Sequence, residues 1–191
     1  MTSPTFNDSI TELQETLRAS TALAPAVHAA GSAIIQSLKN GGKLLTCGNG
    51  GSAADALHLS EELVGRYKTE RRALPAICLN ADVTALTCIG NDYGYDRIFS
   101  RQVEALAKTG DVLVGFSTSG NSPNVLAAFE AAKLKGTITI LLSGKDGGQM
   151  KDTCHHEIII PSNTTARIQE IHTLILHQWL EAIDSADWSA L

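Results

Sequence analysis

Two side chains in the stretch LLTCGNGGSAADALHLSEE, residues 44–62, have the types and the spacing of an acid–base or metal-binding pair. His58 and Glu62 are four residues apart, so on a helix both side chains leave the same face. Before them, a glycine-rich turn at residues 48–52 lets the backbone fold tightly and approach a ligand closely. Ser52 is expected to cap the following helix, whose free N–H groups suit an anion. This stretch therefore predicts a phosphate site with an acid–base or metal-binding pair beside it.

A second polar loop, STSGNS at residues 117–122, gives the stronger signal for phosphate. It follows an apolar run and precedes Pro123, and proline is favoured at the first position of a helix. A turn that is merely capped needs one hydroxyl group, whereas this loop has four. Hydroxyl groups together with helix N–H groups make a neutral cradle for a phosphate dianion. We therefore expect phosphate binding by the hydroxyl groups of Ser117, Thr118, Ser119 and Ser122.

A third polar group lies near the start of the final helical segment and comprises Arg167, Gln169, Glu170, His172 and His177. Imidazole, carboxylate and amide groups would suit Zn²⁺ or another divalent ion. On a straight helix, however, Gln169 and His177 are ~12 Å apart along the axis. One ion can reach both only if both side chains are stretched, or if Gln169 precedes the regular helix. We therefore hypothesise that one of the two clusters, on residues 58–62 or 169–177, meets the site of a neighbouring subunit.

Each motif also has a simpler interpretation. Residues 48–53 fit the dinucleotide-binding pattern G-x-G-x-x-G/A. The acidic residue expected about 20 positions later is not clearly present, since Asp82 lies further on, and a turn without a ligand remains possible. His58 and Glu62 are compatible with a surface pair, and His172 with a buried core histidine. The pair His155-His156 indicates a solvated turn before a strand.

Alternating strands and helices are expected to position these residues. Helical spacing predicts one or two helices within residues 4–40, with a start signal at Ser3-Pro4 and an end at Asn40-Gly41-Gly42. Strands are predicted at residues 43–47, 75–79, 111–116, 137–142 and 157–160. Helices are predicted at residues 52–67, 81–90, 97–108, 123–135, around 149, and 166–183. The fold class is therefore α/β, a three-layer, doubly wound, five-stranded parallel sheet with extra N-terminal helices. A polar loop follows every strand, and in such sheets ligands bind at the carboxyl ends of the strands.

Length and composition fit one domain. With 191 residues and no linker or repeat, we predict a single domain with a helical segment at residues 1–40 and an α/β core at residues 41–191. A net charge of −5 disfavours nucleic-acid binding, which needs a basic surface, but allows local phosphate binding by backbone amides. The four cysteines form no C-x-x-C pair, and no signal peptide or membrane-length apolar run is visible. We therefore predict a cytoplasmic protein that binds neither nucleic acid nor membrane.

The final helix has apolar residues on more than one face, so we expect it to be buried nearly all round. A thick helical layer formed with the N-terminal helices explains this pattern. A subunit interface explains it as well, and we favour the interface.

Several motifs together resemble those of one known family. They are CGNGGSAADA-x-H-x-x-x-E, GNDYGY, FSRQVEAL, GDVL-x-G-x-STSGNS, GKDGG and ARIQE-x-H-x-x-x-x-H. The chain is similar, from about residue 41 to residue 177, to the phosphoheptose (sedoheptulose-7-phosphate) isomerases, bacterial proteins built on the sugar-isomerase (SIS) fold. In the N-terminal helices the chain resembles the family in the character of its residues more than in their identity. Arg72 departs from the family, whose members often have proline at this position in an R-P-x-x-P-A stretch.

The resemblance implies a set of site residues. It implies one Zn²⁺ per subunit with the ligands His58, Glu62, Gln169 and His177. It implies substrate contacts from Glu62 and Gln169, and also from Asn49, Gly50, Gly51, Asn91, Asp92, Ser117, Thr118, Ser119 and Ser122, with Ser52 close by. It further implies a homotetramer with sites at subunit boundaries. The implied role is to make the heptose precursor, later ADP-heptose, of lipopolysaccharide core or of related surface glycans.

The implied reaction converts D-sedoheptulose 7-phosphate to D-glycero-D-manno-heptose 7-phosphate through an enediol. We assign Glu62 as the base that removes the proton next to the carbonyl group, and His177 as the acid–base partner at the sugar oxygens. Two other functions are weighed against this one. A non-enzymatic SIS protein that binds the replication initiator would lack Glu62 and His177, and both are present. A nicotinamide-dependent oxidoreductase is suggested only by residues 48–53.

Overall fold

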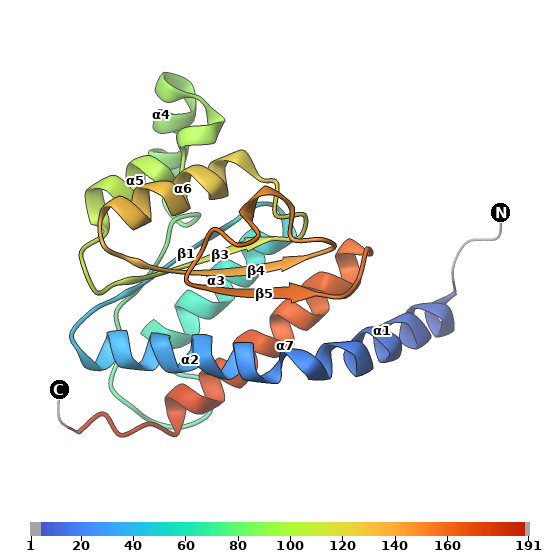
Figure 1. Ribbon diagram of the computed structural model, residues 1–191. Helices are drawn as coiled ribbons and strands as arrows, with labels where there is room; N and C mark the ends of the chain where they lie inside the picture. Colours follow the sequence, from blue (N-terminus) through green and yellow to red (C-terminus); the bar gives the residue numbers. More distant parts are fainter. Residues whose placement is uncertain (1–4, 190–191) are drawn as a thin grey trace.

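The computed structural model describes residues 5–189, and its centre is one five-stranded sheet. All strands are parallel and lie in the order β2-β1-β3-β4-β5 (Figure 1). The strands are β1 (Leu44–Gly48), β2 (Ala76–Cys78), β3 (Val112–Ser117), β4 (Ile138–Gly144) and β5 (His156–Ile160). The predicted doubly wound parallel sheet is therefore confirmed.

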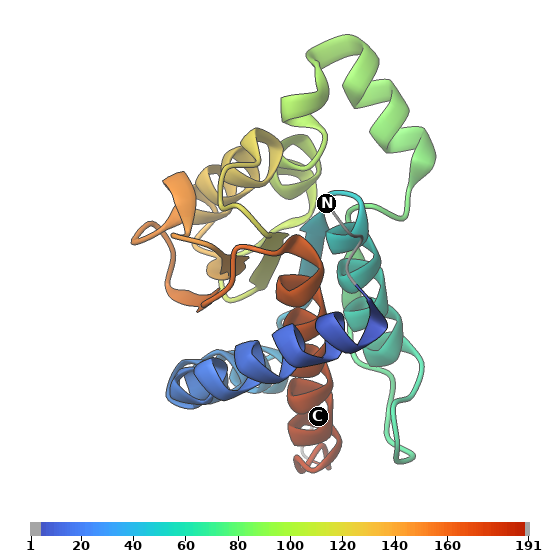
Figure 2. The same cartoon turned by 90° about the vertical axis from the view of Figure 1, so that its right-hand side faces the viewer.

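Helices cover both faces of the sheet (Figure 1). One face is covered by α2 (Ala24–Lys39), α3 (Gly51–Val64) and α7 (Thr165–Asp184). The other is covered by α5 (Ser100–Leu106) and α6 (Pro123–Leu134). The remaining helical elements are α1 (Phe6–Ser20), η1 (Thr21–Leu23), α4 (Val83–Tyr93), η2 (Tyr95–Arg97) and η3 (Gly148–Met150). In Figures 1 and 2, α1 extends past the sheet and α4 stands away from the body.

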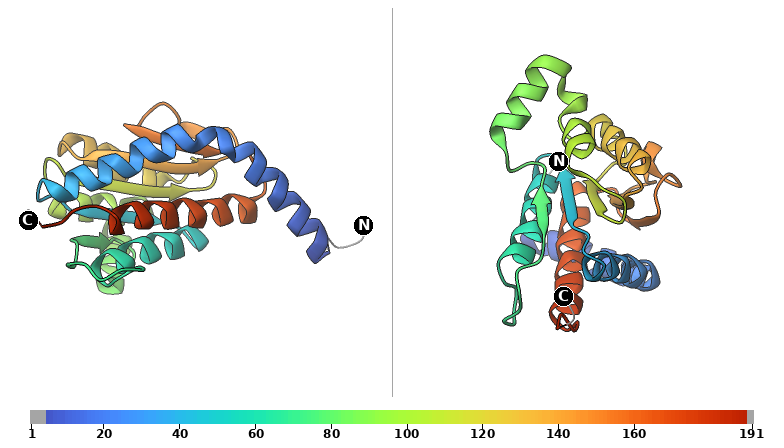
Figure 3. Two further views of the ribbon diagram at one scale, coloured as in Figure 1. Left: turned by 90° about the horizontal axis from the view of Figure 1, so that it is seen from below. Right: turned by 90° about the vertical axis from the view of Figure 1, so that its left-hand side faces the viewer.

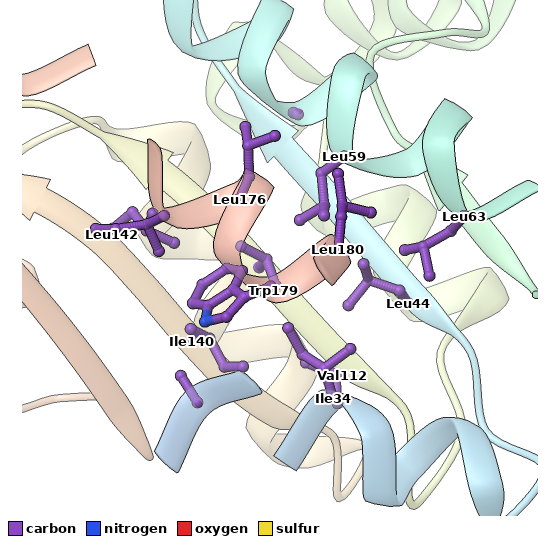
Figure 4. Close-up of a cluster of buried hydrophobic side chains, with 14 of the residues drawn as sticks. Ile34, Leu44, Leu59, Leu63, Val112, Ile140, Leu142, Leu176, Trp179 and Leu180 are labelled. Atoms are coloured by element: carbon purple, nitrogen blue, oxygen red, sulfur yellow. The ribbon is translucent and has the colours of Figure 1, made fainter. Parts of the chain in front are cut away.

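The strands are buried on both faces because neighbouring residues point to opposite sides. Leu44 faces the layer of α2, α3 and α7, whereas Leu45 faces the layer of α5 and α6. Figure 4 shows the first of these two cores, where Trp179 of α7 packs among aliphatic side chains. The Trp179 indole N–H donates to the carbonyl oxygen of Val27 in α2 at 2.8 Å. A Cβ on Gly31 would lie 2.7 Å from the Trp179 ring, so glycine here allows α2 to approach α7 closely.

Several element boundaries differ from the prediction. The start signal at Ser3-Pro4 lies outside the described residues, and α1 begins after a capping box formed by Thr5 and Asp8. The helix predicted for residues 52–67 ends at Val64 and is followed by Gly65. Gly65 was the end signal that the predicted range ran past.

The solvated turn predicted at His155-His156 is confirmed for His155, which is exposed in the bend before β5, and wrong for His156. His156 is the first residue of β5, and the ring Nδ1 of His155 accepts a hydrogen bond from the Thr139 backbone N–H at 3.0 Å. A parallel strand pairs through its backbone whatever its side chains are, so a polar residue can begin it.

The final helix, α7, is not buried all round within one chain. Ile168, Ile175 and Leu176 are buried, whereas Leu174 is 51% exposed and Gln178 lies on the same open side. Among residues 5–189, no helix combines the length and the apolar character needed to cross a membrane.

Candidate functional site

The site is organised by α3 and α7, which lie side by side and run in the same direction (Figure 3, left). Three pairs of residues meet along this line, from the start of α3 towards its end: Gly51 with Gln169, Asp55 with Thr173, and His58 with His177. A Cβ on Gly51 would lie 2.5 Å from Nε2 of Gln169. Thr173 Oγ1 donates to Asp55 Oδ1 at 2.9 Å. The two helices thus bring residues more than 100 positions apart into contact.

His58, Glu62 and His177 form one group, which we call the acid–base cluster. Nε2 of His58 lies 3.5 Å from Oε1 of Glu62. The rings of His58 and His177 meet edge to face, with centroids 5.1 Å apart. The ring of Tyr67 stacks on the imidazole of His177, with ring centroids 5.7 Å apart and an interplanar angle of 21°. Glu62 and His177, to which we assigned proton transfer, therefore both contact His58 within a single chain.

The donor atoms of this cluster fit a divalent cation. Ligand atoms of His58, Glu61 and Glu62 all lie within 4.8 Å of one another, and the ring of His177 meets that of His58. Imidazole nitrogens and carboxylate oxygens are the donors that Zn²⁺ takes in proteins. Gln169 lies elsewhere: it is inside α7, not before it, and its side chain packs against Gly51. It is ~12 Å from His177 along the helix axis, so within one chain the two could bind the same ion only with both side chains stretched.

The two polar loops meet at the carboxyl edge of the sheet, and we call residues 48–52 and 117–122 together the phosphate cup. They are neighbours because Gly48 of β1 pairs with Phe116 of β3 in the sheet register. The side-chain amides of Asn49 and Asn124 exchange two hydrogen bonds, each 2.9 Å long. Asn124 was not predicted as a site residue, although an amide in the first turn of α6 was the signal for it. These two bonds therefore hold the loop at Asn49 and the start of α6 at a fixed distance from each other.

Within the cup, the hydroxyl groups of Ser117 and Ser122 are 2.8 Å apart, and the Asn121 backbone N–H donates to Ser119 Oγ at 3.2 Å. Thr118 and Ser119 are half-buried. All four predicted hydroxyl residues thus lie on one short loop between β3 and α6. The helix α6 begins directly after these hydroxyls, at Pro123, so the positive end of its dipole faces the loop, as an anion site requires.

The GKDGG turn, residues 144–148, packs against the STSGNS loop backbone to backbone. A Cβ on Gly120 would lie 1.8 Å from the carbonyl oxygen of Gly147, and one on Gly148 would lie 2.3 Å from that of Ser119. The Gln149 backbone N–H donates to Oδ1 of Asn121 at 3.0 Å. This close contact leaves no room for a side chain at Gly120 or Gly148. The φ angles of these two residues, +62° and +57°, also favour glycine.

Ser52 does not cap α3, so that prediction is wrong. The helix begins at Gly51, and its cap residue is Gly50, with φ 57° and no side-chain capping bond. A positive φ at the cap position favours glycine, which leaves Ser52 in the first turn, buried. The Ser52 backbone N–H donates to the Asn49 carbonyl oxygen at 3.1 Å, so Ser52 still belongs to the rim of the cup.

Asn91 and Asp92 lie at the end of α4 and are exposed. Nδ2 of Asn91 donates to Oδ1 of Asp92 at 2.7 Å. The segment reaches the cup through Tyr95, whose hydroxyl donates to Oδ1 of Asn49 at 2.9 Å. The structure therefore joins the end of α4 to the cup through Tyr95, and leaves Asn91 and Asp92 themselves open to solvent.

His172 is a core histidine, as one of the interpretations held. It is fully buried, and Nε2 lies 3.1 Å from the carbonyl oxygen of Ser143. Burial lowers the pKa of His172 to about 4, so the ring is neutral at pH 7 and donates this hydrogen bond. Ser143 in turn donates from Oγ to the carbonyl oxygen of Ser117 at 2.8 Å. His172 thus ties α7 to the floor of the phosphate cup.

Within one chain, the cup and the acid–base cluster lie at opposite ends of α3. Gly51 begins this helix and Glu62 lies near its end, which places them about 16 Å apart along the axis. His58 lies about 10 Å along the same axis.

Comparisons with known proteins agree with this architecture. A family model for the SIS domain matches residues 5–144. The chain is 61% identical over 155 residues to the phosphoheptose isomerase of Citrifermentans bemidjiense, covering 81% of each chain. It is 53% identical over 173 residues to that of Campylobacter jejuni, covering 91% of this chain and 93% of the relative.

Solved structures give the same result. The phosphoheptose isomerase of Neisseria gonorrhoeae superposes with a TM-score of 0.87 at 44% identity, over 93% of this chain and 96% of that one. The enzyme of Francisella tularensis superposes with a TM-score of 0.88 at 38% identity, over 96% of this chain and 100% of that one. With its parallel sheet, its hydroxyl-lined loop and its paired helices, this chain belongs to the phosphoheptose isomerase family of SIS-domain proteins.

Proposed function

We propose that this chain is an aldose–ketose isomerase that converts D-sedoheptulose 7-phosphate to D-glycero-D-manno-heptose 7-phosphate in heptose biosynthesis. The position of His58, which contacts both His177 and Glu62, carries this proposal. A carboxylate base and an imidazole acid are the two groups that enediol chemistry needs. The hydroxyl-lined cup supplies the matching site for the phosphate of the substrate.

In this mechanism Glu62 takes a proton from C1 of the ketose, and the resulting enediolate receives a proton at C2. His177 moves a proton between the oxygens on these two carbons. Ser117, Thr118, Ser119 and Ser122 bind the phosphate, and binding energy at this remote group orients the reacting carbons. Each proton taken up is returned, so the reaction needs no redox partner.

Zn²⁺, one per subunit, is the proposed metal, held by His58, Glu62 and His177, with Gln169 completing the family's ligand set. When bound, the ion polarises the substrate carbonyl and stabilises the enediolate charge. A carboxylate bound to the ion would not be free to act as a base, so Glu62 would serve as ligand in the resting site and as base in turnover. Metal content before and after treatment with a chelator, with His58→Ala as the control protein, tests the assignment.

We also propose a homotetramer whose sites combine residues of different subunits. A groove between α1, α2 and α7 supports it, with an apolar lining of Leu17, Leu23, Val27, Ile171, Leu174 and Ile175. The separation of about 16 Å between cup and Glu62 along α3 supports a shared site. Sedimentation tests the assembly. Because His58 and His177 touch in one chain, variants of these two residues would not report on sharing between subunits. The informative test mixes the Glu62→Gln protein with the Ser119→Ala protein. Recovered activity supports shared sites, and no recovery favours a site within one chain.

The cellular setting is proposed on composition. The four cysteines are free thiols, which supports the cytoplasm as the location. Lipopolysaccharide core is the proposed destination of the heptose, on the family resemblance alone. The net charge of −5 continues to predict that nucleic acid is not a partner.

The decisive experiment is to follow the purified protein with sedoheptulose 7-phosphate, with and without a chelator. Formation of the aldose, lost on chelation and restored by Zn²⁺, supports the isomerase and its metal together. Complete absence of turnover in the metal-loaded protein would favour the non-enzymatic alternative, which nothing in the site favours at present.

A further inference from the structure

The side chain of Arg71 lies at the C-terminal end of α3, close to Glu62. Nη2 donates to the carbonyl oxygen of Glu62 at 2.6 Å, and Nη1 donates to that of Leu63 at 2.9 Å. The last carbonyl groups of a helix have no partner inside the helix. Arg71 therefore supplies two donors that α3 lacks, and it holds the backbone of Glu62 directly.

The guanidinium of Arg71 is also half of a buried ion pair. Its Nε lies 2.9 Å from Oδ1 of Asp184, and the two side chains are only 4% and 5% exposed. Asp184 is the last residue of α7, so this pair joins the ends of the two helices that carry Glu62 and His177. A buried charge is costly unless it is paired, so the two groups depend on each other.

Asp184 also holds the loop that follows α3, which lies beside the C-terminal end of α7 (Figure 3, left). Its Oδ2 accepts hydrogen bonds from the backbone N–H groups of Lys68 and Thr69, at 2.8 and 2.9 Å. Burial by itself raises the pKa of Asp184, but these bonds and Arg71 outweigh it and leave the pKa below its ordinary value. The residue just before this anchor is Tyr67, whose ring stacks on His177.

We propose that Arg71 and Asp184 are positioning residues that keep Glu62 and His177 in register for proton transfer. Arg71 holds Glu62 through its carbonyl group, and Asp184 holds Tyr67 against His177 through the loop backbone. Neither residue is among the proposed substrate contacts, and the inference rests on the proposed roles of Glu62 and His177. A displacement of about 1 Å at a reacting group can cost about 100-fold in rate, so this link matters for catalysis.

The first test is Arg71→Lys, which keeps the charge but loses the forked set of donors. We expect kcat to fall at least about tenfold while KM stays within about twofold, because the phosphate cup is untouched. Arg101→Lys, the same change at an exposed arginine of α5, is the matched control. A folded Arg71→Lys protein with the kcat of the wild type would overturn the inference.

A double-mutant cycle with Asp184→Asn separates positioning from general stability. If the two residues act as one unit, the double variant loses no more kcat than the worse single variant. If the fold-losses in kcat of the two single variants multiply in the double variant, the residues act independently, which would contradict the link. Thermal unfolding of each variant, with and without sedoheptulose 7-phosphate, shows whether the cup still binds.

If Arg71→Lys does not fold, Tyr67 provides the test. Tyr67→Phe keeps the stacked ring and should keep kcat, whereas Tyr67→Ala should lower kcat and leave KM unchanged. Equal kcat in Tyr67→Ala and the wild type would overturn the inference. Wild-type protein without isomerase activity would instead remove the proposed function and this inference with it, so the two failures are distinguishable.

Discussion

The phosphate cup and the acid–base cluster are held in place by different means. The cup is fixed by backbone contacts, with Gly120 and Gly148 pressed against facing carbonyl groups and Asn49 paired with Asn124. The cluster consists of side chains on two helices, with ring contacts between them and a buried ion pair at their ends. Substrate binding should therefore be sensitive to main-chain changes, and turnover to the register of α3 and α7.

The largest effect is expected from Glu62→Gln, which removes the base of the cluster without changing the cup. Turnover should fall by about a thousandfold, within the range for a lost general base, while the affinity for substrate stays close to that of the wild type. Steady-state kinetics measure both quantities. Glu130→Gln, at an exposed position of α6, is the control. Normal turnover in Glu62→Gln would end the assignment.

The next effect concerns His172, which connects the two regions. Its pKa is lowered to about 4 in the folded chain, against an ordinary value of 6.5. The unfolded chain therefore binds a proton first as pH falls, so stability is retained above pH 6.5 and lost between 6.5 and about 4. The loss should be about 3 kcal/mol.

Urea unfolding at pH 7 and pH 4 measures this loss. The variant His172→Gln keeps a donor for Ser143 and cannot titrate, so its pH dependence should be smaller by that amount. Identical pH dependence in the two proteins would show that His172 does not set it.

Gly148→Ala should weaken the cup selectively. The added methyl group meets the Ser119 carbonyl oxygen, so the STSGNS loop must shift. We expect KM for the sugar phosphate to rise about tenfold, with a smaller change in kcat. Gly41→Ala is the matched control, because Gly41 has φ +81° but no atom within 4 Å of the added Cβ. An equal rise in KM in both variants would mean that backbone strain alone is responsible.

The smallest effect is expected at the edge of the cup, from Tyr95→Phe. This change removes one hydrogen bond to Asn49 at an exposed position, worth about 1 kcal/mol. KM should rise a few-fold, and Tyr93→Phe, on the same exposed segment, should leave it unchanged. A KM equal to that of the wild type would show that Asn49 is held by Asn124 alone.

The sequence predicted the fold more completely than it predicted the site. Strand positions and the parallel sheet followed from apolar runs and long connections, which are local signals. The meeting of His58 with His177 could be stated only as a family property, because helix pairing depends on contacts between residues far apart in the chain. Tyr67, Arg71 and Asp184 were missed for the same reason: a capping arginine that arrives from a loop leaves no periodic signal.

Ser52 illustrates the opposite case, where a local rule gave the wrong answer. Serine is a good capping residue. The turn, however, needs a positive φ two residues earlier, and Gly50 provides it. The cap therefore moved to the residue that could adopt the backbone angle.

The helices α3, α6 and α7 all begin at the carboxyl edge of the sheet, just after or near the polar loops. Each start carries a partial positive charge of about half a unit from aligned peptide dipoles. An acidic protein can therefore present a locally attractive field to a dianion without any lysine or arginine in the loop itself. A phosphate ester loses half of its second charge near pH 6. The affinity for the substrate should therefore fall in mild acid even if no protein group changes its protonation state.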